Sequence, residues 1–508
     1  MGKICIVILI CITSQSYSQN IIYSDPEAEN IFTLNNYIIG EMKGNLLIYK
    51  SDSLKSSILV YDNNMKLKNN VPLDFISKAN LLTIAFIKTV DGCYLLYQVA
   101  ENEKVYYKVG AFNENGKLSE AIRIIDSTET STINESILYN FIQSENKEYT
   151  LLNRMISGLE PKELRVDQIV LDAKCNIKKN EHYFIPFFDN ENISNPVIDN
   201  EGSICFVKFK NPLNTNKGHI AFYKLKKISP DLEIKEFEIK DAIFENPIIK
   251  IDKSNNIYHI VSLYRKQLSN TNTGIAILKI GADASKDISP LLYPFHQTVT
   301  KSDNKTKNSL NNYYTLKDFI INSDGNVAAL LSILNVDLNK ATFRENSVPY
   351  NVMRTKSERV NLNGYVEIDK QIYYQMSPEE NPYSPFTRSY DYRVIKHNLV
   401  IYSFDKNNHL SNFSTLDKDL IEQNSIPFYL KINLEKQPVF IYTDKKNIRH
   451  LRNFTLQNDG TIMANPMFKN LNLGYKFYLD LGKQIDATTL IIPCEKNGKL
   501  SFAKIEFK

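Results

Sequence analysis

Two kinds of tight turn alternate along nearly the whole chain, and the pair returns about every 50 residues. One kind, such as Asp91-Gly92 or Ser323-Asp324-Gly325, stands between two short apolar runs. The other follows after a further apolar run, as at Asp62-Asn63-Asn64 and Asn458-Asp459-Gly460. Asn, Asp and Gly suit hairpin turns because they accept positive φ or form local side-chain hydrogen bonds. Self-similarity at a fixed period predicts a repeat architecture.

Alignment of these turns divides the chain into eight units. The first kind of turn lies near Gly44, Gly92, Asn146, Gly202, Asn256, Gly325, Lys436 and Lys483, and the second near Asp62, Glu114, Ala173, Pro230, Ala282, Lys406, Asn458 and Asn497. The runs between turns are short, rich in Ile, Val, Tyr and Phe, and lack a helical period. Two hairpins per unit make about four strands, which is one propeller blade. We therefore predict an all-β, β-propeller-like fold with roughly seven or eight four-stranded blades.

Two units depart from the regular pattern. The last, from about Tyr475 to Lys508, has room for only three strands, and we expect the N-terminal run Ile21-Ile22-Tyr23 to complete it. In the sixth unit the two turns, at Asp324 and Lys406, lie much further apart than elsewhere. This spacing predicts an insertion at about 336–389, with a hairpin of its own over 359–369. Inserted loops often carry the function of repeat proteins.

A group of aromatic and basic residues lies in and just after this insertion. Tyr and Arg are enriched at binding hot spots, so we take the group as the candidate binding surface. The alternative is that Tyr390 and Tyr392 begin the next blade strand while the Pro-rich part packs over a propeller face. The candidate residues are Tyr373, Tyr374, Tyr383, Phe386, Arg388, Tyr390, Tyr392 and Arg393.

Residues 1–18 have the pattern of a secretory signal peptide. Lys3 is followed by the apolar run from Ile4 to Ile12, and Ser16-Tyr17-Ser18 places small residues before a cleavage point at Gln19. The apolar run is too short to span a bilayer, and no later run approaches the length required. We expect an exported protein, periplasmic or extracellular, with no transmembrane anchor and a single domain over 19–508.

Cleavage would leave the cysteines Cys93, Cys175, Cys205 and Cys494. In an exported protein four cysteines allow three disulfide connectivities, and the alternative is four isolated buried thiols in separate units. Their spacing fits no metal site, and the seven histidines are scattered without a His-Glu-x-x-His pattern. Asp/Asn/Gly turns resemble fragments of calcium loops, but none continues into a complete loop. We predict no metal and no cofactor.

Composition and motifs exclude several classes of function. The net charge is only +4, and no basic face with interleaved aromatics argues for nucleic acid. No nucleophile-elbow, phosphate-loop or dinucleotide motif is present. The chain contains no Trp, so it cannot carry complete Trp-Asp repeats or the Asp-box repeats of sialidases.

The segment 389–419 resembles one found in secreted, uncharacterised β-propeller-like proteins of Gram-negative bacteria. In those proteins a Tyr-rich approach leads into a strand of the form Asn-x-Ile-Val-x-x-x-Asp-x-x-Gly-x-Leu, followed by an aromatic residue. The likeness extends over the C-terminal part of the chain, and it implies a propeller and export but no activity. The matching residues are Asn398, Val400, Ile401, Asp405, Leu410 and Phe413, with Asn408 where Gly is usual and Phe413 where Trp is usual.

The sequence therefore favours an exported, non-enzymatic binding or scaffold protein that contacts a protein or an extracellular polymer. The contact would use one propeller face and the insertion of the sixth unit. Two alternatives remain at this point. A hydrolase or lyase acting on polysaccharide or peptide needs no linear motif, because propeller sites draw single residues from several blades. A purely structural repeat protein would have no small-molecule site at all.

Overall fold

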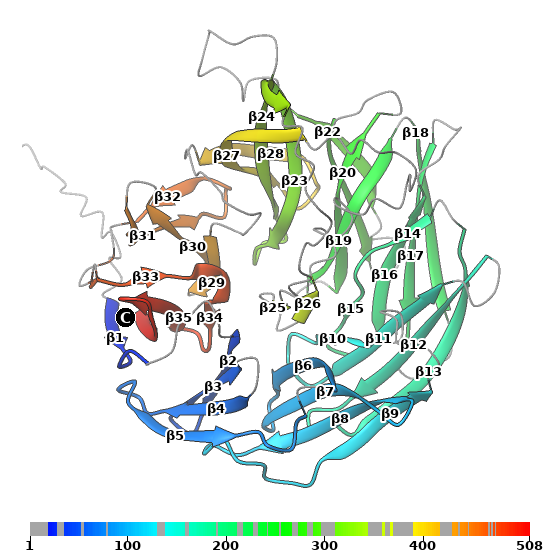
Figure 1. The fold of residues 1–508 in the computed structure, drawn as a ribbon. Coiled ribbons are helices and arrows are strands. Elements are labelled where there is room, and N and C mark those ends of the chain that lie inside the picture. The colour runs from blue at the N-terminus through cyan, green and yellow to red at the C-terminus, as the bar shows by residue number, and fades with distance from the viewer. Residues whose placement is uncertain are drawn as a thin grey trace, which may run out of the picture.

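The strands of this chain form a ring of antiparallel blades (Figure 1). The protein is represented by a computed structural model, which describes residues 19–27, 35–51, 55–77, 80–129, 138–157, 162–188, 191–210, 217–226, 232–240, 242–252, 256–266, 273–281, 288–295, 310–343, 358–360, 366–368, 390–416, 429–434, 437–444, 447–465, 468, 471–472 and 474–507. Over these ranges there are eight blades, so the expected β-propeller is confirmed with the larger of the two blade counts.

The first four blades follow one another along the chain, each from its innermost to its outermost strand. Blade 1 contains β2 (Asn35–Met42), β3 (Asn45–Ser51), β4 (Ser56–Tyr61) and β5 (Leu67–Pro72); blade 2 contains β6 (Leu81–Lys88), β7 (Cys93–Glu101), β8 (Lys104–Phe112) and β9 (Arg123–Glu129); blade 3 contains β10 (Asn140–Gln143), β11 (Thr150–Ser157), β12 (Glu163–Leu171) and β13 (Ile177–Pro186); blade 4 contains β14 (Glu191–Ile193) and β15 (Val197–Ile198), both paired with β16 (Ile204–Lys210), then β17 (Lys217–Leu225) and β18 (Leu232–Lys240).

The remaining blades include the interrupted sixth and the closing eighth. Blade 5 contains β19 (Ile243–Asp252), β20 (Ile257–Arg265), β21 (Gly274–Gly281) and β22 (Ile288–Pro294); blade 6 contains β23 (Leu310–Ile321), β24 (Val327–Phe343), β27 (Tyr390–Phe404) and β28 (Leu410–Leu416); blade 7 contains β29 (Tyr429–Leu434), β30 (Gln437–Asp444), β31 (Asn447–Leu456) and β32 (Ile462–Ala464); blade 8 contains β33 (Lys476–Phe477) and β34 (Lys483–Gln484), separated by the 3-10 helix η6 (Leu479–Leu481), then β35 (Thr489–Lys496), β36 (Lys499–Phe507) and β1 (Gln19–Tyr23).

The N-terminal strand closes the ring, as expected. β1 pairs antiparallel with β36, with Gln19 opposite Phe507 and Tyr23 opposite Ala503. The backbone N–H of Ser24 extends the ladder by donating to the carbonyl of Phe502 at 2.9 Å. The two ends of the described chain thus lie in one sheet, so blade 8 is complete only when both are present.

The hydrophobic core is divided among the junctions between neighbouring blades. Ile58 and Val60 of blade 1 pack with Phe86 and Leu95 of blade 2, and each other junction has a corresponding apolar cluster. The middle strands are covered on both faces and are therefore almost continuously apolar, as in β21, where every residue is buried. The outermost strands alternate instead, as β18 does.

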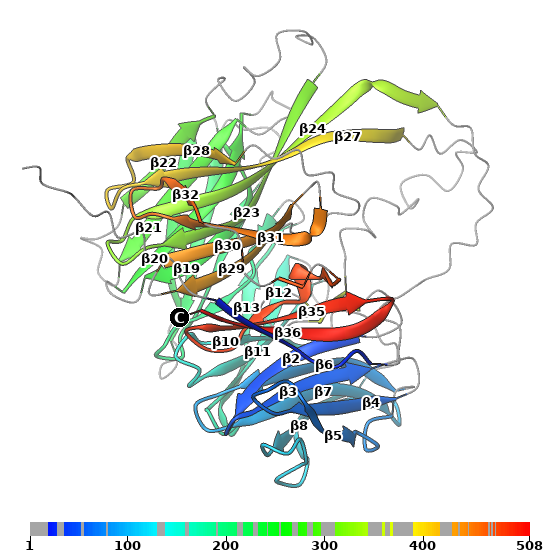
Figure 2. The same cartoon turned by 90° about the vertical axis from the view of Figure 1, so that its left-hand side faces the viewer.

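The turns that set the sequence period lie on one side of the ring, except the turn at Asn497. In an antiparallel blade, the connections between the first and second strands and between the third and fourth lie at the same end. We call this end the turn face. The opposite side, which carries the second-to-third connections and the links between blades, is the connector face (Figure 2).

The last unit is the one place where the predicted turn assignment is wrong. Lys483 lies in β34, and the first-to-second turn of blade 8 is closed further on, where the N–H of Ile485 donates to Thr489 at 3.0 Å. Asn497 joins the second and third strands, β35 and β36, on the connector face. A third-to-fourth turn is absent from the described part of blade 8 because its fourth strand comes from the other end of the chain.

Candidate functional site

Six turns of the turn face share one geometry. In the turn that begins at Asp405, the Oδ1 atom accepts the backbone N–H groups of Asn407 at 2.9 Å and His409 at 2.8 Å. The fourth residue, Asn408, has φ of +66°, where Gly is usual. The first residues of equivalent turns are Asp62, Asn113, Asp172, Asp199 and Asn322. In all six turns the Oδ1 atom thus accepts hydrogen bonds from the backbone of its own turn.

Hydrogen bonds from blades 1 to 6 to the blade that follows each of them also fasten the turn face. Ser414 of blade 6 donates to the carbonyl of Gly460 in blade 7 at 3.1 Å. The ammonium group of Lys279 in blade 5 donates to the backbone carbonyl of Lys406 in blade 6 at 2.5 Å. Corresponding bonds link the earlier blades, from Asn45 to Glu114, Thr89 to Ala173, Lys179 to Lys226 and Lys235 to Gly281. The face is therefore a continuous set of buttressed turns with little freedom to change shape.

The connector face differs from blade to blade. In blades 2, 7 and 8 the second-to-third connection is two residues, as at Asn102-Glu103. The three longest connections, 295–309, 344–389 and 417–428, lie around blades 5 to 7. Variable loops on a rigid frame are where repeat folds place binding and catalytic residues. The long connections therefore make this sector of the connector face the candidate binding region.

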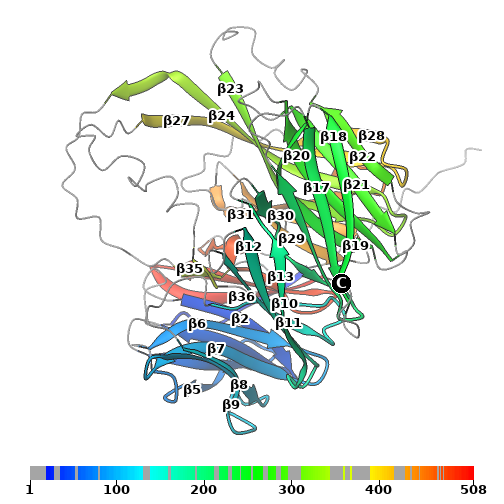
Figure 3. The same ribbon diagram turned by 90° about the vertical axis from the view of Figure 1, so that its right-hand side faces the viewer.

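The longest connection begins and ends on a two-stranded arm. β24 and β27 are longer than the other strands of blade 6, and their ends reach away from the ring (Figures 2 and 3). The arm is paired to its tip, where Phe343 lies opposite Tyr390. Between the two strands, β25 (Glu358–Val360) and β26 (Val366–Ile368) form the predicted hairpin, and β26 lies beside β6 of blade 2.

The predicted aromatic and basic group is only partly located. Tyr390, Tyr392 and Arg393 lie in the outer half of β27, with Arg393 opposite Asp337. Tyr390 and Tyr392 thus begin the third strand of blade 6, as the alternative interpretation held, but on the part of the strand that forms the arm. The rest lie outside the described residues: Tyr373, Tyr374, Tyr383, Phe386 and Arg388. The proposed signal peptide, 1–18, is outside them as well.

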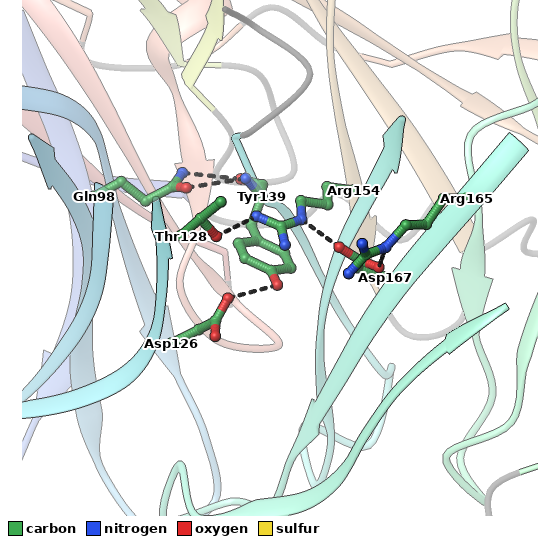
Figure 4. A network of polar contacts seen from close by, with 7 residues as sticks. All are labelled: Gln98, Asp126, Thr128, Tyr139, Arg154, Arg165 and Asp167. Atoms are coloured by element: carbon green, nitrogen blue, oxygen red, sulfur yellow. Dashed lines mark hydrogen bonds and ion pairs between the residues drawn. The ribbon is translucent and has the colours of Figure 1, made fainter. Parts of the chain in front are cut away.

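The most extensive polar network lies between blades 2 and 3 (Figure 4). Arg154 donates through Nε to Asp167 and through Nη1 to Thr128, both at 2.6 Å. Its guanidinium lies 4.5 Å from the centre of the Tyr139 ring. Arg165 donates to the other oxygen of Asp167, also at 2.6 Å. With both carboxylate oxygens bound to arginines, Asp167 has no role as a general base.

The same network is satisfied at its other end. The Tyr139 hydroxyl donates to Asp126 at 2.8 Å, and its backbone N–H donates to Gln98 at 3.0 Å. Gln98 returns a bond to the carbonyl of Tyr139 at 3.2 Å and a second to Thr83 at 2.7 Å. Burial raises the pKa of Tyr139 far above its usual value, so the phenol stays protonated. The network holds two blades in register and leaves no reactive group.

A second charged group borders the axis of the ring. Asp318 on β23 pairs with Lys250 on β19 at 2.5 Å and with Lys431 on β29 at 2.6 Å. Burial lowers the pKa of Lys250 to about 8, in spite of the opposing effect of Asp318. Burial acts to raise the pKa of Asp318, but the two ammonium groups outweigh it and hold that pKa below its usual value. The carboxylate of blade 6 thus offsets one of the two positive charges, which come from blades 5 and 7.

His259, His409 and the four cysteines of the described residues lie outside these two charged groups. His259 is buried, and its ring nitrogens lack a hydrogen-bond partner in the described structure. Burial, helped by the charge of Lys279, lowers the pKa of His259 to about 3 and keeps the ring neutral. His409 is exposed and lies 3.4 Å from Asp405. The four cysteines are buried free thiols, and across the described ranges no group of His, Cys, Asp and Glu is placed to hold a metal ion.

Sequence reasoning missed the Lys250, Asp318 and Lys431 group. Each member is a charge within the apolar strand that precedes the first turn of its unit, in units five, six and seven. That shared position was the available signal, since inner strands of neighbouring blades lie side by side. The pairing itself depends on blade packing, which no local pattern encodes.

Comparison with known proteins finds only distant likenesses among solved structures. No protein-family model matches the chain, and no curated protein matches its sequence. The WD40 domain of SCAP from fission yeast is similar over 96% of this chain and 98% of that chain, at 7% identity and a TM-score of 0.38. An uncharacterized protein of Listeria monocytogenes is similar over 84% of this chain and 94% of its own, at 8% identity and a TM-score of 0.36.

A prolyl endopeptidase is also similar, over 95% of this chain but only 55% of that chain, at 8% identity and a TM-score of 0.37. This chain thus spans about half the length of that enzyme. Such distant likenesses carry no argument about activity. The described residues contain no helix long and apolar enough to cross a membrane.

Proposed function

We propose that this protein is a non-enzymatic scaffold that binds a protein or an extracellular polymer through its connector face. The observation that carries the proposal is the contrast in length between connections. Those of the turn face are short and repeated, whereas the connector face carries 295–309, 344–389 and 417–428 around blades 5 to 7. A rigid frame with one elaborated sector is the arrangement in which loops supply recognition.

The proposed contact residues lie on and beyond the arm of β24 and β27. Tyr390, Tyr392 and Arg393 belong to the outer half of β27. With Tyr373, Tyr374, Tyr383, Phe386 and Arg388 they form a group rich in Tyr and Arg. Such side chains combine large apolar area with hydrogen-bonding ends, which is why they dominate interface energetics. We further propose, from the pattern of residues 1–18, that the protein acts outside the cytoplasm.

The alternative of a hydrolase or lyase has less support. Acid–base catalysis needs a free acid or base with a suitable pKa. Asp167 is bound by two arginines, Asp318 by two lysines, and His259 is buried and neutral. These two carboxylates are thus already committed to ion pairs, and the imidazole stays uncharged. This distribution of charge favours the scaffold over the enzyme.

The test removes the insertion and keeps the frame. Residues 344–389 are replaced by Asn-Gly, which suits a two-residue hairpin and joins Phe343 to Tyr390, already paired across the arm. We expect the unfolding temperature and the far-UV circular dichroism to stay near those of the full chain. Capture of cross-linked partners from cell-envelope extracts, quantified against the full chain, should be lost.

A matched pair of point variants narrows the result to the arm. Tyr392→Ala should weaken partner capture, whereas Phe184→Ala should not. Phe184 is an exposed aromatic residue, 53% accessible, on the outermost strand of blade 3. Unchanged capture by a folded deletion variant would show that the connector-face sector is not the binding region.

A further inference from the structure

Two lysines from different blades meet on the innermost strand of blade 1. Lys88, at the end of β6, donates to the carbonyl of Glu41 at 2.6 Å. Lys483, on β34, donates to the carbonyl of Ile39 at 3.2 Å and to the hydroxyl of Tyr37 at 2.9 Å. All three acceptors lie on β2, whose inner edge borders the ring axis (Figure 1). The two ammonium groups therefore approach β2 from blades 2 and 8.

A third lysine adds its charge to the same place. Lys147 lies in the first turn of blade 3, and burial together with the charges of Lys88 and Lys483 lowers its pKa. Burial raises the pKa of the Cys93 thiol, but all three lysines act in the opposite direction on it. Gln143, which directly precedes this turn, donates to the backbone carbonyl of Lys88 at 3.0 Å, so the turn that carries Lys147 lies beside the end of β6 that carries Lys88.

None of these charges is neutralised by the surrounding protein. Among the described residues no carboxylate forms an ion pair with any of the three lysines. Glu41 contributes only its carbonyl, and Glu145 and Glu148, which flank Lys147 in its turn, do not pair with it. Several ammonium protons are left without an acceptor, since each group has three.

A side chain need not be charged to donate to the backbone carbonyls on the inner edge of a first strand. Elsewhere around the axis a neutral side chain donates to the backbone carbonyl of an inner strand. Gln143 donates to the carbonyl of Lys88 at 3.0 Å, and Gln484 donates to the carbonyl of Asn433 at 2.8 Å. Where Lys250 donates to Phe319 at 2.5 Å, Asp318 accompanies it. Only at β2, within the described structure, do lysines support an inner edge without an acidic partner.

We propose that Lys88, Lys147 and Lys483 form a binding site for a polyvalent oxyanion, a phosphate or sulfate group, at the turn-face end of the ring axis. An oxyanion with two or more charges offsets more of the threefold positive charge than a monovalent carboxylate does. Its several oxygens also accept charge-assisted hydrogen bonds from more than one ammonium group. The site lies on the opposite face from the connector-face region, and its test is independent of the test of the scaffold proposal.

The test is calorimetry on the full chain at constant ionic strength. Inorganic phosphate and sulfate should bind, and acetate should bind at least roughly tenfold more weakly. Glycerol 2-phosphate distinguishes two sources of the same group. Affinity equal to that of phosphate indicates a phosphate ester of a larger molecule, and much weaker binding indicates a free ion; either supports the site.

Matched substitutions locate the binding. Lys147→Gln should weaken phosphate binding by roughly tenfold, because one charge-assisted bond is lost. Lys162→Gln is the control, since Lys162 is an exposed turn lysine of the same blade, with φ of +68° against +60° for Lys147, but on the connector face. Its affinity for phosphate should equal that of the full chain.

Lys483→Gln is a second, independent variant. Its unfolding transition is recorded together with its phosphate binding, so that a folding defect would be detected. It too should bind phosphate roughly tenfold more weakly. The proposal is wrong if the full chain binds neither phosphate nor sulfate at matched ionic strength. It is equally wrong if folded Lys147→Gln and Lys483→Gln retain full affinity.

Discussion

The two faces of this ring are built in opposite ways. On the turn face an Asp or Asn at the start of six turns accepts the backbone N–H groups two and four residues on, as Asp172 does for Lys174 and Asn176. The preceding blade then holds the turn in place, as when Thr89 donates to Ala173 at 2.6 Å. On the connector face no such rule repeats, and lengths run from Asn102-Glu103 to 344–389.

This difference means that the turn face contributes to the stability of the ring, whereas the connector face varies in the length and sequence of its connections. Changes on the turn face act on contacts between blades, and therefore on the ring as a whole. Changes on the connector face act on segments that the blades do not need for closure. The contrast predicts that equivalent substitutions cost more on the turn face, and the following experiments test it in order of expected effect.

The largest effect should come from Gly460→Ala. Gly460 has φ of +83°, and an added Cβ would lie 1.9 Å from Oγ and 2.3 Å from Cβ of Ser403 in the neighbouring blade. We expect a loss of about 3–5 kcal/mol in the free energy of unfolding, because blade 6 or blade 7 must shift. Urea unfolding measures it.

Gly498→Ala is the matched control on the connector face. Gly498 has φ of +78° and nothing within 4 Å of an added Cβ. Only backbone strain should appear, about 1–2 kcal/mol. Equal costs for the two substitutions would contradict the view that the turn face is held by contacts between blades.

Acid should weaken the protein next most. Because burial lowers the folded pKa of His259 to about 3, the unfolded chain takes up a proton near pH 6.5 while the folded chain does not. The stability is present above pH 6.5 and is lost as the pH falls toward 3. We expect a loss of about 2–3 kcal/mol between pH 7 and pH 4.

His259→Phe should remove most of that slope, as measured by urea unfolding at the two pH values. The ring of His259 lies near the turn-face end of β20, the third residue of the strand. A slope in the variant as steep as in the parent protein would show that the acid sensitivity arises elsewhere.

The smallest effect should come from the turn oxygens themselves. Asp405→Ala removes the acceptor for the N–H groups of Asn407 and His409. We expect a loss of about 1–2 kcal/mol, measured by urea unfolding at pH 7. Asp405→Asn should cost little, because Asn113 and Asn322 fill the same position in other blades. A large loss for Asp405→Asn would mean that charge, rather than the oxygen, is required.

Much of the fold was predictable because its signals are local. A hairpin turn is decided by a few adjacent residues, so Asp324-Gly325 marks a turn wherever the blade lies. The deficit of one strand in the last unit predicted closure by Ile21-Ile22-Tyr23, which β1 confirms. The prediction failed at Lys483 and Asn497 because the missing fourth strand removes a turn that the period assumes.

The charged groups were not predictable in the same way. Lys250, Asp318 and Lys431 are each unremarkable in their own strands, and so are Lys88, Lys147 and Lys483. Their meaning depends on which side chains face one another across the ring. The same arrangement places a carboxylate beside the first lysine group and, among the described residues, none beside the second.

The sequence by itself determined the class of fold, the place of the turns and the way the ring closes. Each of these follows from hydrogen bonding and apolar burial within one unit or between consecutive units. Only the tertiary structure decided that the turns form one face, that the long connections gather on the other, and that lysines from blades 2 and 8 meet at β2. The physical reason is that a ring brings together residues far apart in the chain, and Coulomb energy depends on that distance in space.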